Sequence, residues 1–364
     1  RLYGNRASNT GGAVYADARA DFATGNEARF CAFDTRFDGN IAQEGSVLYL
    51  DTDNFLTDYF GAEAHLNNDN LCDSHPLRVR CGPQEQCNTI EGNRAENANG
   101  QATSGAVFTV QNDAFLTLGQ LIIRDNTGGH VLHGFDDAYT FMHSLLVVGN
   151  STTSDLLRIQ DDGGSTALRD STLAGNTIGS GNVLSINGTL EISRAIIWQP
   201  GLTTLAHNSE PLLVENTIAS ESDSLGGSPG ARVAFPRFVD PDRGDFQLRA
   251  ASPAIDYVDP VNQNPWDVIG VPRNRRLDVV PRESGLVRDI GAYERPSLLP
   301  LVLNGDFDAD SNLWPATTAG MSSWDSTQNA AGAASSGSIK VTQAGTPNQQ
   351  RVYGLNQCIH LPGP

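Results

Sequence analysis

Two pairs of adjacent aspartates are the residues in this sequence best suited to chemistry. Asp136-Asp137 and Asp161-Asp162 lie 25 residues apart, counted from 136 to 161, and histidines at 130, 133 and 143 flank the first pair. Carboxylates held close together repel one another, so such a cluster favours a bound cation or raised pKa values. We therefore expect these four aspartates to be the candidate ligands of a metal ion, with Ca²⁺ as the cofactor to test.

The same four aspartates could also cleave a polysaccharide, which is the alternative function. A glycoside hydrolase uses two carboxyl groups as acid and base, whereas a lyase pairs Ca²⁺ with a basic residue that abstracts a proton. The only lysine is Lys340, and the Gly-His-Gly and Arg-Ile-Lys motifs of polygalacturonases do not occur. Solvated polar corners are therefore the simplest interpretation of the pairs, ligand binding comes second and catalysis last.

A second group of candidates lies near the end of the chain. Asp306 and Asp308 alternate as in calcium loops, without the glycine and distal glutamate of an EF-hand. Trp314 and Trp324 are either core residues or flat surfaces on which a sugar could stack. We expect the two aspartates as candidate metal ligands and the two tryptophans as candidate ligand-binding residues.

A repeat of about 25 residues must position the aspartate pairs. Apolar runs end in Asp125-Asn126, Gly149-Asn150 and Gly175-Asn176, spaced by 24 and 26 residues, and residues 182–193 alternate apolar with polar. Short strands at a fixed period in the twenties indicate a solenoid. Since the strands are too close in sequence for crossover helices, each coil stacks on the last at about 4.8 Å. Residues 1–235 then hold about nine coils, with Asp136 over Asp161.

The repeated asparagine is best explained as a corner of the coil. Gly and Asn tolerate the left-handed backbone of a corner, and stacked Asn side chains can hydrogen-bond along the axis. The interval from Asn40 to Asn93 is too long for one ordinary repeat. Either two coils occur there with a degenerate corner, or one coil carries a loop stapled by cysteines.

Three stretches resemble known bacterial families. Gly4-Asn5-Arg6-Ala7 followed by Gly11-Gly12-Ala13 resembles the repeat of polymorphic outer-membrane proteins. The motifs at 238–241, 244–248, 252–256 and 289–294 together resemble the choice-of-anchor Q block, which closes right-handed parallel β-helix proteins of bacterial cell surfaces. Asn304-Gly305-Asp306-Phe307, with Trp314 and Trp324, is similar to the start of a carbohydrate-binding jelly-roll module. These resemblances imply a C-terminal cap over the last coil and a partial β-sandwich after it.

Charge and cysteine content narrow the partners and the compartment. The net charge is −18, with 24 basic and 42 acidic residues, so nucleic acid is not an expected partner. Four cysteines, Cys31, Cys72, Cys81 and Cys87, lack zinc-site spacing and could form two disulfides in any of three pairings. No apolar run is long enough to span a membrane as a helix. We expect a secreted or cell-surface protein cut from a longer chain.

The sequence thus predicts an all-β chain: a right-handed, single-stranded parallel β-helix, resembling pectate lyases in its solenoid, with a C-terminal cap and a partial β-sandwich. The expected domains are the β-helix at 1–235, the cap block at 236–295, a linker at 296–300 and the partial jelly roll at 301–364. The expected function is a surface scaffold or adhesin that binds glycans without catalysis. Its oligomeric state stays open.

Overall fold

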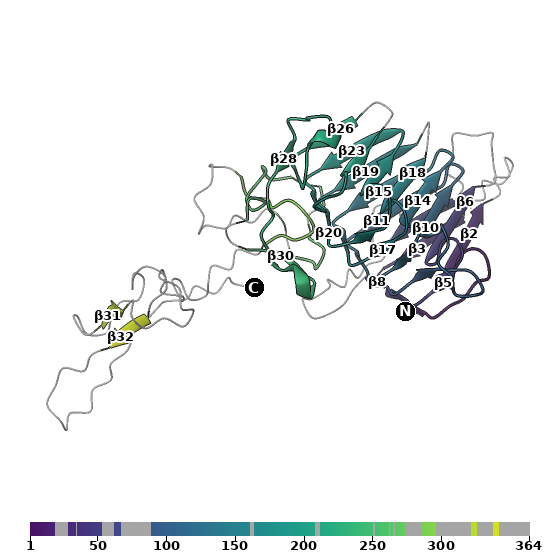
Figure 1. Cartoon of the computed structure of the whole chain (residues 1–364), viewed down its shortest axis with the longest axis horizontal. Helices are drawn as coiled ribbons and strands as arrows, with labels where there is room; N and C mark the ends of the chain where they lie inside the picture. Colours follow the sequence, from purple (N-terminus) through teal and green to yellow (C-terminus); the bar gives the residue numbers. More distant parts are fainter. Residues whose placement is uncertain are drawn as a thin grey trace, which may run out of the picture. The chain divides into compact units, whose positions relative to one another are not determined.

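Four parallel sheets wind through most of this all-β chain in the computed structural model (Figure 1). The structure describes residues 1–18, 28–33, 35–52, 62–66, 89–160, 164–207, 212–249, 252–261, 263–264, 266–271, 273, 286–295, 322–325 and 338–341. The chain forms two compact units, residues 1–276 with 282–296, and residues 277–281 with 297–364. The solenoid belongs entirely to the first unit.

Each full coil passes through the four sheets in turn. Sheet 1 contains β2 (Val14–Ala18), β6 (Leu48–Thr52), β10 (Ala106–Gln111), β14 (His130–Phe135), β18 (Leu157–Gln160), β22 (Leu184–Ile186) and β25 (Leu205–Ala206). Sheet 2 contains β3 (Ala28–Ala32), β7 (Ala62–Leu66), β11 (Phe115–Gly119), β15 (Tyr139–His143), β19 (Ser165–Arg169), β23 (Thr189–Ser193) and β26 (Leu212–Glu215).

The next two sheets complete the coil. Sheet 3 contains β1 (Leu2–Tyr3), β4 (Phe37–Asp38), β8 (Thr89–Glu91), β12 (Ile122–Arg124), β16 (Leu146–Val148), β20 (Thr172–Ala174), β24 (Ile196–Trp198), β27 (Thr217–Ala219) and β28 (Ala231–Val233). Sheet 4 contains β5 (Ile41–Ala42), β9 (Arg94–Ala95), β13 (Thr127–Gly128), β17 (Ser151–Thr152) and β21 (Thr177–Ile178). The predicted parallel solenoid is confirmed.

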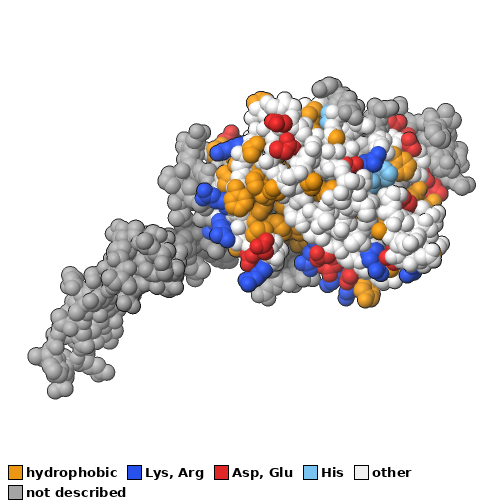
Figure 2. Space-filling view, in the orientation of Figure 1, with side chains coloured by type: hydrophobic (Ala, Val, Ile, Leu, Met, Phe, Trp, Pro, Cys, Tyr) orange, Lys and Arg blue, Asp and Glu red, His pale blue; other side chains and the backbone are white. Residues whose placement is uncertain are grey.

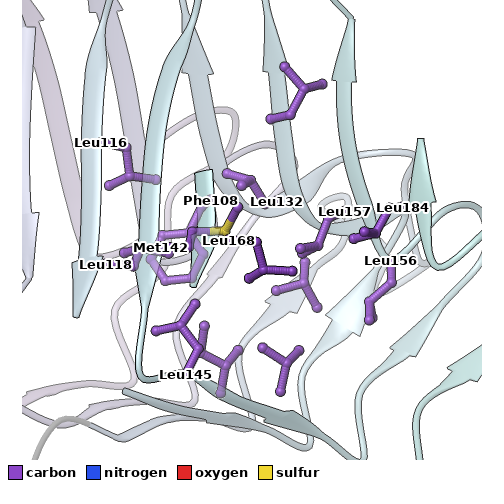
Figure 3. Close-up of a cluster of buried hydrophobic side chains, with 14 of the residues drawn as sticks. Phe108, Leu116, Leu118, Leu132, Met142, Leu145, Leu156, Leu157, Leu168 and Leu184 are labelled. Atoms are coloured by element: carbon purple, nitrogen blue, oxygen red, sulfur yellow. The ribbon is translucent and has the colours of Figure 1, made fainter. Parts of the chain in front are cut away.

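The core consists of like residues stacked on successive coils. Phe108 pairs with Leu132, which pairs with Leu157 and then Leu184, and all four are buried. Figure 3 shows these side chains inside the coil with Leu116, Leu118, Met142 and Leu168. Because side chains alternate across a strand, the intervening residues face outward. The outer faces therefore carry the residues available for function.

The predicted asparagine ladder forms along one corner. Asn5, Asn40, Asn93, Asn126, Asn150 and Asn176 stack in order, and each Oδ1 from Asn40 onward accepts from the backbone N–H and Nδ2 of the previous asparagine. Gln199 ends the ladder with its Oε1 3.0 Å from the nitrogen of Asn176. The left-handed residue is the one before each asparagine, such as Gly149 at φ 66°. The residue before each asparagine thus supplies the left-handed backbone, and the asparagine supplies the hydrogen bonds along the axis.

The long interval between Asn40 and Asn93 is a single coil with an insertion. β4 pairs with β8, and β5 pairs with β9, so no rung of the ladder is missing. The extra residues fall between β6 and β7, at 53–61, and between β7 and β8, at 67–88, and both stretches are outside the described residues. Of the two predicted arrangements, the structure has the one with the excursion.

The described residues between 236 and 295, here called the flanking block, lie along the side of the solenoid. They contain β29 (Phe238–Asp240), the 3₁₀ turn η2 (Pro241–Arg243) and β30 (Asp245–Leu248), with β29 and β30 antiparallel. Beyond this hairpin the described chain is irregular. The Gln120 side chain donates to the carbonyl of Asp267, and the Ser144 hydroxyl donates to the carbonyl of Trp266. These contacts lie on coils well before the last.

A different segment, residues 221–225, contacts the last strand of sheet 1. η1 (Asp223–Leu225) buries Leu225 completely. The Glu221 carboxylate accepts from the backbone nitrogen of Thr204 at 2.7 Å, and the Ser224 hydroxyl accepts from that of Leu205 at 3.0 Å. Glu221 and Ser224 thus satisfy the N–H groups of Thr204 and Leu205 at β25, the last strand of sheet 1. The predicted role of residues 236–295 as an end cap stays a prediction, and the contacts of Gln120 and Ser144 with this segment are lateral.

In the second unit, the structure describes one antiparallel pair. β31 (Ser322–Asp325) pairs with β32 (Ser338–Val341) in register from Ser322 opposite Val341. Two short strands are compatible with many β folds. The jelly-roll module therefore stays a prediction.

Candidate functional site

The first predicted aspartate pair occupies the corner between sheets 1 and 2. Asp136 and Asp137 have φ of 54° and 62° and are exposed. Asn112 and Asp113 make the same corner one coil earlier, with φ of 56° and 59°. Since Asp and Asn tolerate left-handed backbone better than most residues, the turn explains the residue types without a ligand.

The structure describes only one of the two aspartate pairs that were predicted to stack. Phe135 pairs with Gln160, the residues that precede the pairs, so the strands have the predicted register. Asp161 and Asp162 lie outside the described residues. Within the part of the chain that the structure describes, no group of three or more His, Cys, Asp or Glu could hold a metal ion. Calcium binding by the four aspartates stays a prediction.

The other predicted site residues are mostly beyond the description. Asp306, Asp308, Trp314, Cys72, Cys81 and Cys87 lie outside the described residues. The backbone of Trp324 belongs to β31, and Cys31 lies exposed on β3. The ligand, metal and disulfide predictions at these positions therefore stay as they were.

Aromatic, acidic, basic and histidine side chains lie together on the outer surface of sheet 1. One outward row runs coil by coil through Tyr15, Tyr49, Thr109, His133, Arg158 and Ser185. A parallel row two residues further on contains Asp17, Asp51, Gln111, Phe135 and Gln160. We call these two rows the sheet 1 face. Figure 2 shows histidine, basic and hydrophobic side chains close together over the region of β14 and β18.

Two tyrosines form a stacked pair at the first coils of this face. The rings of Tyr15 and Tyr49 lie 5.4 Å apart and are inclined by only 11°. Tyr15 is 52% exposed, so a ring remains available to solvent. Burial, together with the charge of Asp51, raises the pKa of Tyr49 to about 12. The Tyr49 phenol therefore stays protonated and can donate a hydrogen bond at neutral pH.

A second aromatic group lies further along the same face. The rings of His130 and Phe135 each lie 5.0 Å from that of His133. Burial, with the nearby His130 and Arg158, lowers the pKa of His133 to about 4. The imidazole is thus neutral at physiological pH. Both of its ring nitrogens are shielded from solvent.

Polar groups surround the aromatic rings and are largely tied to one another. The Asn112 amide donates to Asp51 at 2.7 Å, and the Thr109 hydroxyl donates to Glu44 at 3.3 Å. The Arg158 guanidinium lies 3.8 Å from Asp155. Burial raises the pKa of Glu44. The sheet 1 face combines flat apolar rings with fixed donors and acceptors, which suits recognition of a sugar ring with its C–H face and hydroxyls.

Sequence reasoning missed this face although a signal for it existed. Tyr15 and Tyr49 each occupy an outward position between apolar residues, with acidic Asp17 and Asp51 two residues later. Knowledge of the register between coils would have placed Tyr15 beside Tyr49 and Asp17 beside Asp51. The spacing of 34 residues, from 15 to 49, hid the relation because it departs from the period of about 25.

Comparison with known proteins gives no relative for this chain: no protein-family model matches it, nor does any curated protein or solved structure. Among the described residues, no helix is both long and apolar enough to cross a membrane. Function must therefore be argued from the geometry alone.

Proposed function

We propose that this chain is a secreted or cell-surface scaffold, built on a right-handed parallel β-helix, that binds glycans through the sheet 1 face without catalysis. The observation that carries the proposal is the Tyr15–Tyr49 stack, which continues in register into Thr109 and His133. Successive coils repeat at about 4.8 Å, and the exposed residues of the two rows, among them Tyr15, Asp17 and Gln160, form a strip along the axis. Such a strip suits a chain-like ligand.

Charge favours an uncharged glycan. The chain carries −18 net charge, and Asp17, Asp51 and Asp136 lie on or beside the face. A polyanion would meet a repulsive field. Arg158 is the one basic residue in the two rows and faces Asp155. We infer that neutral sugars bind more tightly than uronates.

The catalytic alternative gains no support from the described residues. Asp136 and Asp137 lie exposed in a left-handed corner, where the turn itself explains the residue types. We therefore keep the binding function. The module predicted at 301–364 would add a second sugar contact, and Ca²⁺ would be structural wherever it bound.

A glycan array with the full chain, with and without Ca²⁺, tests the proposal. The informative variant is Tyr15→Ala with Tyr49→Ala, and the matched control is Tyr3→Ala, an exposed tyrosine (65%) on sheet 3. Loss of ring stacking should weaken binding about tenfold, which corresponds to about 1.4 kcal/mol. Binding that survives the double variant and drops with Tyr3→Ala would exclude the sheet 1 face.

A lyase and hydrolase screen on the same glycans checks the absence of catalysis. The expected result is no product with the wild-type chain in either Ca²⁺ or a chelator. Product that disappears on Asp136→Asn and Asp161→Asn would replace the binding function with the enzymatic one.

A further inference from the structure

The last strand of sheet 3 has an open edge at the C-terminal end of the solenoid. β28 pairs with β27 on one side, and no other strand of the described chain pairs with it. The N–H of Thr217 in β27 donates to the carbonyl of Gly230 at 2.8 Å. Because the peptide groups of a parallel strand alternate between its two neighbours, those of Gly230 and Arg232 face β27, and those of Val233 point away from it. No described residue forms a hydrogen bond with the N–H or the carbonyl of Val233.

The side chain of Val233 continues a row of core residues but is itself half exposed. Leu173, Ile197 and Ala219 precede it in this row on successive coils, and all of them are buried in the core. Val233 follows in register with Ala219 and is 53% exposed. A further strand next to β28 would therefore cover Val233 as β28 covers Ala219.

The flanking block covers an apolar outer strip of sheet 3 but leaves β28 exposed. The outward residues of the strip are buried yet lie outside the core: Leu146, Val148, Ala174, Ile196 and Ile218. Gly291 of the block donates its N–H to the carbonyl of Arg194 at 2.8 Å, and a Cβ on Gly291 would lie 2.7 Å from Ile196. The residue of β28 in register with Ile218 is Arg232, which is exposed. The outer side of β28 is thus open to a partner.

An aromatic pair lies beside β28. Phe235 follows the strand and is 58% exposed, and its ring lies 5.5 Å from that of Trp198, edge to face. Figure 2 shows hydrophobic side chains gathered between β28 and β30, with basic side chains along their margin. Although single exposed apolar residues are common, a gathered group with a polar margin marks an interaction surface.

This end of the solenoid carries unmatched positive charge on an acidic chain. Residues 224–239 contain two arginines, Arg232 and Arg237, and no aspartate or glutamate, whereas the net charge of the chain is −18. Both arginines are exposed, and neither forms an ion pair with a described residue, unlike Arg243, which lies 3.4 Å from Asp240. Unpaired guanidinium groups favour carboxylate ligands. We call Trp198, Arg232, Val233, Phe235 and Arg237 the β28 edge.

We propose that the β28 edge binds an extended acidic segment of a partner protein, which joins sheet 3 as a further strand. The backbone of the segment bonds to the open peptide groups of Val233, and its alternate apolar side chains cover the exposed valine. Its carboxylates lie across from Arg232, where opposite charges on neighbouring strands attract. An arginine on a strand edge disfavours basic or wholly apolar strands, so the same residue selects the partner.

The same observations separate this partner from other occupants. A lipid surface has no strand to offer to the peptide groups of Val233. A second copy of the chain also carries a net charge of −18, so the two copies repel one another. An acidic peptide matches the backbone edge, the apolar side chains and the arginines together.

Fluorescence anisotropy of short labelled peptides with the full chain is the test. The probe alternates valine with glutamate; one matched peptide alternates valine with lysine, and another is the valine–glutamate peptide with N-methylated amides. The probe should bind, and each matched peptide should bind at least about tenfold more weakly, because one lacks the carboxylates and the other cannot form strand hydrogen bonds. No binding of the probe, or equal binding of all these peptides, would overturn the proposal.

Variants at the edge test the assignment of its residues. Arg232→Glu should reverse the preference, from the glutamate peptide to the lysine peptide, with an unchanged melting temperature because the side chain is exposed. Val233→Pro removes the N–H that points away from β27 and should weaken binding of the probe at least about tenfold. The matched control is Arg243→Glu, at the arginine paired with Asp240, which should bind as the wild-type chain does. A preference that Arg232→Glu leaves unchanged contradicts the assignment, whether or not Val233→Pro folds.

Sedimentation of the full chain decides between the peptide and the other occupants. The chain should neither self-associate nor bind vesicles that contain phosphatidylglycerol through this edge. Self-association or vesicle binding that Phe235→Asp abolishes would replace the peptide with a second copy or with a lipid surface.

Discussion

Replacing Asn150 by alanine should destabilise the solenoid more than most single changes. Its Oδ1 accepts from the backbone nitrogen and Nδ2 of Asn126, at 3.1 and 2.9 Å. Its Nδ2 donates to the carbonyl of Ile123, to that of Val148 and to Asn176, at 2.9, 3.1 and 2.9 Å. The residue is fully buried, so water cannot replace these partners.

The magnitude follows from the partners that lose a bond. The Asn126 backbone nitrogen and the Ile123 carbonyl each lose a partner in the interior, at about 1–3 kcal/mol each. Two such losses, with weaker effects at the remaining groups, predict a decrease of about 3–5 kcal/mol in the free energy of unfolding. Asn5→Ala at the exposed start of the ladder should cost less than about 1 kcal/mol, since water reaches Asn5.

Guanidinium unfolding of the full chain, followed by far-ultraviolet circular dichroism, measures both variants. A solenoid unfolds through nearest-neighbour contacts, so a broader transition is also expected for Asn150→Ala. Equal losses for the two variants, or a loss below about 1 kcal/mol for Asn150→Ala, would refute the ladder as a source of stability.

Three further changes test other parts of the structure. Gly129→Ala should lower the melting temperature by several degrees, because its Cβ would lie 2.0 Å from the Ser104 carbonyl oxygen; Gly4→Ala, which meets open space and only the backbone strain of φ 61°, should have the smaller effect, and the reverse order would contradict the packing. Glu221 is partly buried, which favours its protonated form, yet hydrogen bonds from Ser224 and Thr204 lower its pKa to about 2. Its contribution is complete above the ordinary glutamate pKa and is lost as the pH falls toward about 2; Glu221→Gln should flatten this acid limb in a melting series, and an unchanged limb would count against a stabilising role of the Glu221 hydrogen bonds. Asp136→Asn should change stability by less than about 0.5 kcal/mol in the same assay, since the side chain is exposed, and a large loss in Ca²⁺ alone would reveal a metal site.

The apolar strip beneath the flanking block left a trace in the sequence. Leu146-Val147-Val148 and Ile196-Ile197-Trp198 are apolar at all three positions. A strand with apolar residues on both faces is typical of a sheet covered on both sides. The cover could not be identified, because the block is joined to these strands by contacts between residues about a hundred positions apart, such as Asp170 and Arg273.

The insertion between Asn40 and Asn93 and the sheet 1 face could not be predicted from the sequence, for the same reason. Sequence left open whether residues 40–93 hold one coil or two, since a period cannot reveal where an insertion ends. Pairing of β4 with β8 decided the question. The Tyr15–Tyr49 stack depended on that kind of pairing too, because an insertion between coils separates neighbours in space by an irregular distance in sequence.

The sequence by itself determined the coil, its period and its asparagine corner, because backbone geometry repeats locally: a left-handed residue and a ladder-forming amide are needed once per turn, whatever lies outside. The tertiary structure decided what lies on the outside. Which residues of sheet 1 stand side by side, and that Asp170 joins a distant block while Asp136 faces water, follow from register and burial. Those quantities depend on contacts between segments far apart in the chain, which local patterns do not encode.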